Sequence, residues 1–145
     1  MSHQIADAIE LADGIAAKLV EHARAAAPRE CCGLLVGRNS RVDECVPTAN
    51  VDPSPSRYQV DPAAHIELTR RLRGSPRSIL GVYHSHPRGG DAPSPSDIAE
   101  AAYPDFIHLI ISMVGAEEPR IRAYRIVGGI VISIALMVGR DGRSS

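Results

Sequence analysis

The sequence predicts a single α/β domain in which a mixed β-sheet is sandwiched by helices. Its 145 residues match the length of one ordinary domain, and 44% of them are hydrophobic, which is enough to form a core. Segments with helical spacing alternate with short apolar segments of strand character. Two of these segments, residues 79–83 and 106–114, are nearly continuous apolar runs, a pattern typical of strands covered on both faces. We therefore expect residues 1–145 to form one domain.

The first third of the chain predicts a strand, a helix and a pair of antiparallel strands. Residues 4–11 alternate weakly between apolar and polar, which indicates an edge strand. Asp13 can cap a helix that ends at Pro28. The apolar run 31–37 then predicts a buried strand, and residues 42–48 are its expected antiparallel partner.

The remaining elements are predicted from turn and capping residues. Prolines and serines indicate a loop at 51–57. A second helix is expected after Asp61, because aspartate followed by proline is a typical helix start. The last two strands, 120–127 and 130–138, flank Gly128-Gly129, which suits a tight hairpin. Together these elements complete the predicted sheet and its helical cover.

Composition and charge exclude several classes of function. The 16 basic and 17 acidic residues nearly cancel, so nothing global directs the protein to nucleic acid or to an anionic membrane. Three cysteines are too few for a disulfide framework and fit a reducing compartment. Charged residues interrupt the N-terminal segment, and the longest apolar run, 130–138, is far shorter than the roughly 20 residues that span a membrane. We expect a cytoplasmic protein.

The stretch from His84 to Asp97 carries the residues with the clearest chemistry. On a strand, His84 and His86 point to the same face, with Cα atoms about 6.6 Å apart for two rises of roughly 3.3 Å each. Ser94-Pro95 can open a helix that brings Asp97 toward the same point. Two imidazole nitrogens and one carboxylate oxygen form the three-ligand set of catalytic zinc, with the fourth position left to water.

Each part of this stretch also has a structural interpretation. A His-x-His tripeptide in a strand is often a hydrogen-bonded pair without a metal. Ser94 and Asp97 fit a helix N-terminal capping box, in which the aspartate turns back to the backbone N–H of the cap residue. The carboxylate of Asp97 cannot fully serve a metal and the cap together, so the two roles compete for the same oxygens. The combination of residues, rather than any one of them, favours the metal site.

The same residues resemble the signature of the JAMM (MPN-plus, or JAB-domain) zinc metalloproteases. The resemblance comprises Glu30 before Cys-Cys-Gly-Leu-Leu-Val-Gly, then His84-Ser-His86-Pro, then Ser94-x-x-Asp97, with seven residues between His86 and Ser94. It implies a cytidine-deaminase-like α/β fold. It also implies that His84, His86 and Asp97 bind zinc, that Glu30 is the general acid/base, and that Ser94 helps to hold the oxyanion.

Elementary chemistry supports these roles. Bound zinc lowers the pKa of its water from about 15.7 to about 7, so a hydroxide nucleophile exists at neutral pH. Glu30 can take the proton of that water and pass it to the leaving amine, a role worth roughly 10² to 10⁴ in rate. A hydroxyl donor at the oxyanion, Ser94, can add on the order of 10². The expected reaction is hydrolysis of an amide or isopeptide bond without an acyl-enzyme. Without the resemblance, Glu30 would be interpreted as an exposed carboxylate between a helix and a strand.

The resemblance also implies a class of substrate. Compact family members act on the C-terminal tail of ubiquitin-like sulfur-carrier proteins, so such a tail is the expected partner. An amidase for small peptide or amino-acid adducts needs the same zinc centre and stays open as an alternative. A metal-free MPN-type binding scaffold is the other alternative, although such a protein is expected to have lost ligands that are present here. A thiol nucleophile at Cys31 or Cys32 is disfavoured, because adjacent cysteines entering an apolar strand usually pack in the core.

Two further features have a structural interpretation. His108 lies inside an apolar strand and is expected to be a hydrogen-bonded core residue. A basic group near the end of the second helix can meet an acidic partner, but a solvated helix end is the preferred explanation. Its members are Arg70, Arg71, Arg73 and Arg77. The sequence leaves the oligomeric state open.

Overall fold

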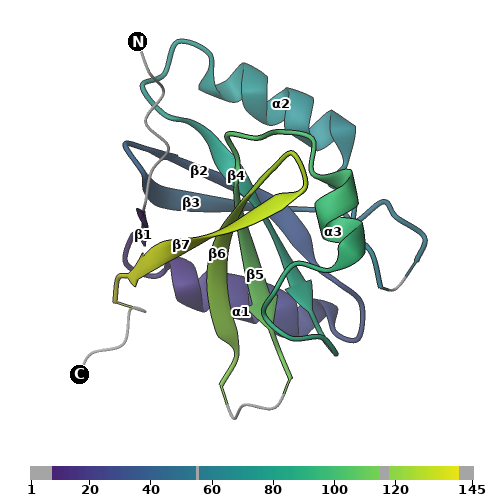
Figure 1. The fold of residues 1–145 in the computed structure, drawn as a ribbon. Coiled ribbons are helices and arrows are strands. Elements are labelled where there is room, and N and C mark those ends of the chain that lie inside the picture. The colour runs from purple at the N-terminus through teal and green to yellow at the C-terminus, as the bar shows by residue number, and fades with distance from the viewer. Residues whose placement is uncertain (1–7, 55, 115–117, 141–145) are drawn as a thin grey trace.

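The computed structural model describes residues 8–54, 56–114 and 118–140, which form one mixed α/β unit. Figure 1 shows its elements in chain order. They are β1 (Ala8–Leu11), α1 (Ile15–Ala26), β2 (Cys32–Arg38), β3 (Arg41–Thr48), α2 (Pro62–Leu72), β4 (Ser78–His86), α3 (Pro95–Glu100), β5 (Ile107–Ser112), β6 (Arg120–Val127) and β7 (Ile130–Val138). All of the predicted helices and strands are present among these, within a few residues of their expected ends. Each described helix is too short and too polar to cross a lipid bilayer.

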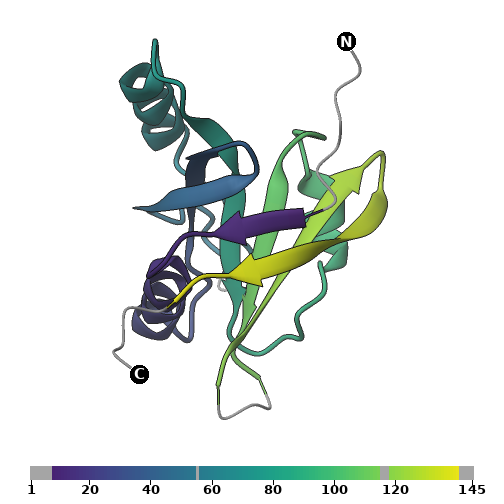
Figure 2. The same cartoon turned by 90° about the vertical axis from the view of Figure 1, so that its left-hand side faces the viewer.

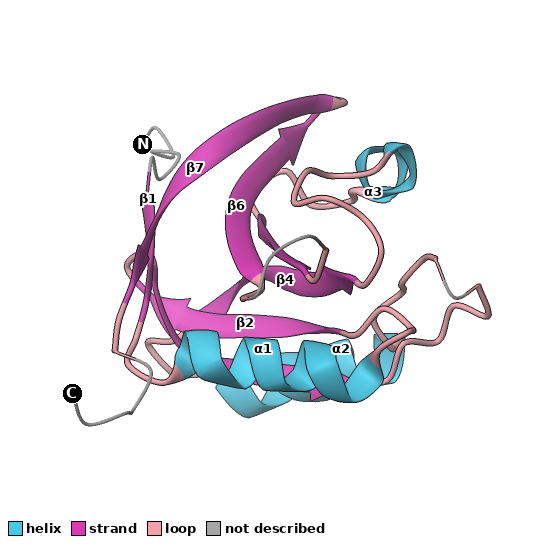
Figure 3. Cartoon of the chain, turned by 90° about the horizontal axis from the view of Figure 1, so that it is seen from below, coloured by secondary structure: helices cyan, strands magenta, loops and turns pink. Residues whose placement is uncertain are grey.

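The strands form one mixed sheet that closes on itself. The order is β1-β3-β2-β4-β5-β6-β7, and β1 pairs in parallel with both β3 and β7. Figure 2 shows β1 lying beside β7, and Figure 3 shows the strong curvature of β6 and β7 that makes the closure possible. The prediction of a mixed sheet is confirmed. The prediction of an edge strand at 4–11 is wrong for the described part, since β1 has a neighbour on each side; residues 4–7 lie outside the described residues.

Strand β2 separates two hydrophobic clusters, because its side chains alternate between the two faces of the sheet. Leu35 packs in the cluster that contains Leu19 of α1. Leu34 packs on the other face, with Leu68 of α2. Figure 1 accordingly shows α2 above and α1 below strands β2–β4. The expected helical cover on both faces is therefore present at the centre of the sheet, while the outer strands curl round to close it.

Local capping confirms one predicted helix start and corrects another. Asp61 caps α2, since its side chain accepts a hydrogen bond from the N–H of Ala63. Asp13 does not cap α1. The N-cap residue of α1 is Gly14, and the Asp13 carboxylate accepts instead from the N–H of Arg140, at 2.9 Å. Asp13 thus ties the start of α1 to the chain that follows β7, a long-range contact that a local capping rule cannot anticipate.

Two of the four arginines near the end of α2 are paired within the chain. The Nη2 atom of Arg77 lies 2.7 Å from a carboxylate oxygen of Asp43 and 2.7 Å from one of Glu44, both in β3. The Nη2 atom of Arg71 lies 2.9 Å from the other carboxylate oxygen of Glu44. The other two are exposed. These partly exposed ion pairs connect α2 and the start of β4 to β3, so the group is a solvated helix end whose acidic partners belong to the same chain.

Replacing Gly81 with alanine is expected to destabilise the fold severely. Gly81 lies in β4 opposite Ile107 of β5, and a Cβ at Gly81 would overlap the backbone of Ile107. Because backbone atoms of a central strand cannot move aside cheaply, the expected loss in the free energy of unfolding is about 3 kcal/mol. Chemical denaturation measures it. Gly90→Ala is the control, since a Cβ at Gly90 meets no atom within 4 Å. Equal stability of the two variants would contradict the prediction.

Candidate metal centre

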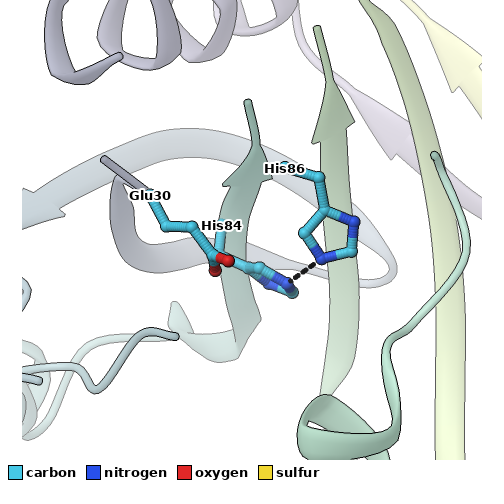
Figure 4. Close-up of side chains that lie close together, drawn as sticks. All are labelled: Glu30, His84 and His86. Atoms are coloured by element: carbon cyan, nitrogen blue, oxygen red, sulfur yellow. Dashed lines mark hydrogen bonds between the residues drawn. The ribbon is translucent and has the colours of Figure 1, made fainter. Parts of the chain in front are cut away.

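The last residues of β4 bring two buried imidazoles together. His84 and His86 both belong to β4, so their side chains lie on the same face of the strand. His84 is 0% exposed and His86 is 7% exposed. Their Nε2 atoms lie 3.0 Å apart, as the dashed line in Figure 4 shows. The strand continues past the apolar run 79–83 and includes both histidines, as the sequence predicts, and this fixes the two rings.

Asp97 completes a tight triangle of ligand atoms. It lies in the first turn of α3 and is buried, with its Oδ2 3.1 Å from Nε2 of His84 and 3.0 Å from Nε2 of His86. The same Oδ2 also accepts a hydrogen bond of 2.9 Å from the N–H of Ser94, which closes the capping box of α3. The sequence predicts that these roles compete. In the structure one oxygen both faces the two imidazoles and closes the capping box, so the helix cap holds the carboxylate against the imidazoles.

Hydrogen bonds and packing fix the orientation of each imidazole. The Nδ1 of His86 donates to the carbonyl oxygen of Gly90 at 2.8 Å, which leaves Nε2 of a neutral ring with its lone pair. His84 has no hydrogen-bond partner at Nδ1 within the described part of the chain. Its ring is instead held by Tyr58, which stacks on it with centroids 4.1 Å apart and planes at 14°. Sequence reasoning missed Tyr58; its only signal is one aromatic residue near a polar loop.

Burial and hydrogen bonds set the charges of these three groups in the metal-free chain. Burial lowers the pKa of His84, which favours its neutral, ligating form. Burial would also raise the pKa of Asp97, but hydrogen bonds from His84 and His86 outweigh it and keep that carboxyl ionised. For His86, burial lowers the pKa, but the hydrogen bonds to Asp97 and Gly90 outweigh it, so the pKa is raised and a cation would have to displace a proton from this ring. One buried carboxylate thus faces two imidazoles, an arrangement that favours a bound cation.

Glu30 lies beside this triangle, at the start of the segment that leads into β2. It is buried, not exposed, and its Oε1 has no hydrogen-bond partner among the described residues. One of its carboxylate oxygens and one ring nitrogen each of His84 and His86 lie within 4.8 Å of one another (Figure 4). Burial raises the pKa of Glu30 to about 7. A carboxyl group that titrates near neutral pH has the pKa expected of a general base.

A cleft of about 420 Å³ opens onto these groups. Its lining includes Glu30, His86 and Ser94, together with Ser56 and Arg88. The Oγ of Ser94 accepts a hydrogen bond from the N–H of Asp97 at 3.1 Å, so the hydroxyl proton of Ser94 is left to donate elsewhere. The structure therefore brings together all five residues that the sequence selects: Glu30, His84, His86, Ser94 and Asp97.

The cysteines do not form a nucleophilic site. Cys31 and Cys32 are buried, and burial raises the pKa of Cys31 to about 11, so its thiol stays protonated at neutral pH. Between the two histidines, Ser85 points to the opposite face of β4, where its Oγ accepts from the N–H of Cys31 at 2.9 Å. The interpretation of Cys31 and Cys32 as core residues is confirmed.

The expectation for His108 is wrong in one respect. The residue is buried, but its Nε2 has no hydrogen-bond partner in the ranges that the structure describes. Burial lowers its pKa to about 4, so the ring is neutral. It lines a second cavity of about 440 Å³, which is also lined by Tyr58, His65 and Phe106.

Glu30→Gln is expected to stabilise the metal-free protein above neutral pH. Burial raises the pKa of Glu30 from its usual 4.5 to about 7 in the folded chain, so as the pH rises through this window the unfolded chain loses the proton first. Stability therefore falls between these two values and the loss persists above them. Glutamine removes that loss. Thermal denaturation after metal removal should show a higher Tm for the variant at about pH 8 and equal values at about pH 4; a lower Tm at pH 8 would refute this.

The chain resembles known peptidases in sequence. The family model of Prok-JAB, prokaryotic homologs of the JAB domain, matches residues 13–127. A CysO-cysteine peptidase of Mycobacterium tuberculosis is 31% identical over 115 residues, which are 78% of this chain and 79% of the relative. A probable TtuB-protein conjugate cleaving protease of Thermus thermophilus is 44% identical over 78 residues, which are 53% of this chain and 52% of the relative.

Solved structures share the fold. The solution structure of a protein from Desulfitobacterium hafniense superposes with a TM-score of 0.83 at 30% identity, covering 91% of this chain and 93% of the other. A structure described as JAMM, a metalloprotease-like zinc site in the proteasome and signalosome, gives a TM-score of 0.54 at 20% identity and covers 90% and 98% of the two chains. The second likeness concerns the fold alone.

Proposed function

Because the chain belongs to Prok-JAB, the family of prokaryotic homologs of the JAB domain, we propose that it is a metal-dependent hydrolase that cleaves an amide or isopeptide bond at the C-terminal tail of a ubiquitin-like or sulfur-carrier protein. The peptidase names of the relatives support the enzyme class and the substrate class. The observation that carries the proposal is the triangle of His84, His86 and Asp97 beside Glu30 at one cleft.

The donor set fits zinc. In a tetrahedral zinc site with bonds of about 2.0–2.1 Å, neighbouring donor atoms are roughly 3.3 Å apart. The ligand atoms of His84, His86 and Asp97 are separated by 3.0–3.1 Å, which is close to this spacing. We therefore assign these three residues as the zinc ligands, with Glu30 outside the ligand set. When bound, zinc supplies a water of lowered pKa and polarises the scissile carbonyl.

The protein groups around the cleft divide the remaining work. Glu30 is buried, and its Oε1 has no hydrogen-bond partner in the described ranges; it accepts the proton of the attacking water and delivers it to the leaving amine. Ser94 donates a hydrogen bond from its hydroxyl to the oxyanion, because its oxygen already accepts from the N–H of Asp97. Asp97 holds the imidazoles of His84 and His86 in place while it completes the capping box of α3. No step needs a covalent acyl-enzyme, which agrees with the raised pKa of the Cys31 thiol.

Three finer statements belong to the same proposal. Residues 1–145 act as one domain, supported by the family match over 13–127. The architecture is cytidine-deaminase-like, supported by the mixed sheet with helices on both faces of β2. The activity is cytoplasmic, supported by three free cysteines, which suit a reducing compartment.

Mass spectrometry tests the proposed reaction. The zinc-loaded protein is incubated with a panel of sulfur-carrier proteins that bear a C-terminal cysteine adduct, and with ubiquitin-like proteins joined to a lysine side chain. Loss of the adduct with release of the free tail is expected. Short peptide and amino-acid adducts in the same panel distinguish a small-molecule amidase. Absence of cleavage across all three groups would overturn the proposal in favour of a binding scaffold.

A further inference from the structure

A single side-chain amide, that of Asn50, joins the loop between β3 and α2 to the backbone of Glu30. Its Nδ2 donates to the carbonyl oxygens of Glu30 at 3.0 Å and Arg57 at 2.9 Å. Its Oδ1 accepts from the backbone N–H groups of Asp52 and Gln59, each at 3.0 Å. The amide therefore uses both of its donor hydrogens and both acceptor lone pairs.

These partners fix both the orientation and the identity of the side chain. Carbonyl oxygens only accept and backbone N–H groups only donate, so the amide cannot be reversed without losing all four bonds. Aspartate has nearly the same shape as asparagine but no donor. At position 50 it would place a carboxylate against the carbonyl oxygens of Glu30 and Arg57, which is unfavourable.

The four bonds reach two groups of the metal centre. The first is Glu30, whose backbone is bonded directly and whose Oε1 has no hydrogen-bond partner among the described residues. The second is Tyr58, which lies between two residues that Asn50 binds, Arg57 and Gln59. The ring of Tyr58 is stacked on His84. One amide thus connects the carboxylate on one side of the site to the ring packed against a histidine on the other.

We propose that Asn50 is a positioning residue that holds Glu30 and, through Tyr58, the imidazole of His84 in one fixed frame. The inference rests on the proposed function, in which Glu30 transfers the proton and His84 binds the metal. Asn50 contacts neither metal nor substrate in this scheme. It acts on catalysis through Glu30 and on metal affinity through Tyr58 and His84, so its removal affects both quantities, whereas a purely structural residue affects only stability.

The test compares Asn50→Asp with Gln59→Ala. Gln59 offers only its backbone N–H to Asn50, so truncating its side chain leaves the bond intact and serves as the matched control. For Asn50→Asp we expect a zinc dissociation constant about tenfold higher by chelator competition, and kcat about tenfold lower with KM within twofold of wild type. For Gln59→Ala all three values should stay within twofold. Wild-type zinc affinity and kcat in Asn50→Asp would overturn the inference.

Three further variants keep the result decisive. Val42→Ala truncates a fully buried side chain of β3 that pairs with Gly37, at the end of β2 far from the site. It therefore reports what lost stability alone does to kcat and zinc affinity.

Tyr58→Leu removes the stacked ring while Tyr58→Phe retains it, so zinc affinity should fall about tenfold in the first and recover in the second. This pair decides the matter if Asn50→Asp fails to fold: unchanged affinity in Tyr58→Leu overturns the inference. Zinc affinity is measured without substrate, so a wild-type protein that cleaves nothing would refute the proposed function and still leave this comparison valid.

Discussion

Asp97→Asn is expected to remove bound metal and with it nearly all hydrolysis, while leaving the fold intact. Asparagine retains an oxygen that can accept from the N–H of Ser94, so the cap of α3 survives. Asparagine lacks the negative charge of the carboxylate. Zinc takes carboxylate oxygen as its oxygen ligand, so the neutral amide should bind the ion poorly. Metal analysis of purified protein should give about one zinc per wild-type chain and little in the variant, with turnover reduced at least about 10³-fold.

Two companion variants isolate the cause. Asp97→Ala removes both the proposed ligand and the capping-box bond from the N–H of Ser94, so it should lose metal and about 1 kcal/mol of stability besides. Asp105→Ala, an exposed aspartate outside the cleft, should bind metal and hydrolyse substrate as the wild type does. Full metal occupancy in Asp97→Asn would show that a different residue supplies the third ligand, and Glu30 would then be the residue to examine.

Glu30→Gln should have the opposite signature, with metal retained and turnover lost. Glutamine fills the same volume but cannot accept and release a proton, so kcat should fall by roughly 10² to 10⁴. Zinc content should remain near one per chain, because the three proposed ligands are untouched. The comparison of the two carboxylate variants also separates the two possible ligand sets, since metal loss in Glu30→Gln with metal retained in Asp97→Asn would exchange the roles assigned here.

The pH dependence of hydrolysis provides a second measure of Glu30. The carboxylate must be ionised to accept a proton, so the rate rises as the pH increases through its pKa, which burial raises to about 7 in the metal-free chain. A bound cation lowers that value, because it stabilises the ionised form. The acidic limb of the wild-type profile should therefore lie below pH 7, and it should be absent from the residual activity of Glu30→Gln. An identical limb in both proteins would assign it to another group.

The central part of the site could be predicted because its geometry is local. The strand backbone fixes the distance between residues two positions apart and points their side chains to the same face. The convergence of His84 and His86 follows from this alternation. Pro95 after Ser94 locates the start of α3 in the same way. Glu30 is different, since nothing local indicates that it is buried or near the histidines. The family resemblance alone placed it there, and the pairing of β2 with β4 explains the proximity.

What could not be predicted depends on contacts between distant segments. Asn50 and Tyr58 join the site only after the loop has folded back on Glu30 and His84, and neither residue has a motif. The closure of the sheet depends on β1 finding partners at both ends of the strand order. The dual role of the Asp97 oxygen was missed because sequence reasoning treats capping and metal binding as alternatives. In three dimensions, one oxygen faces the imidazole of His84 and also accepts from the N–H of Ser94, so the cap and the proposed ligand role are compatible.

The parallel pairing of β1 with β7 has a consequence for the order of folding. β1 leaves the ribosome first and β7 last among the described strands, yet Ala8–Leu11 aligns with Ala135–Val138. Strands β2 to β5, with both histidines, can assemble while translation continues, but the sheet cannot close until β7 has been synthesised. Such non-local closure is slow. In nascent chains stalled before β7, the edges of β1 and β6 that pair with β7 should therefore be open to proteases. The centre of the sheet, which carries the histidines, should already be protected.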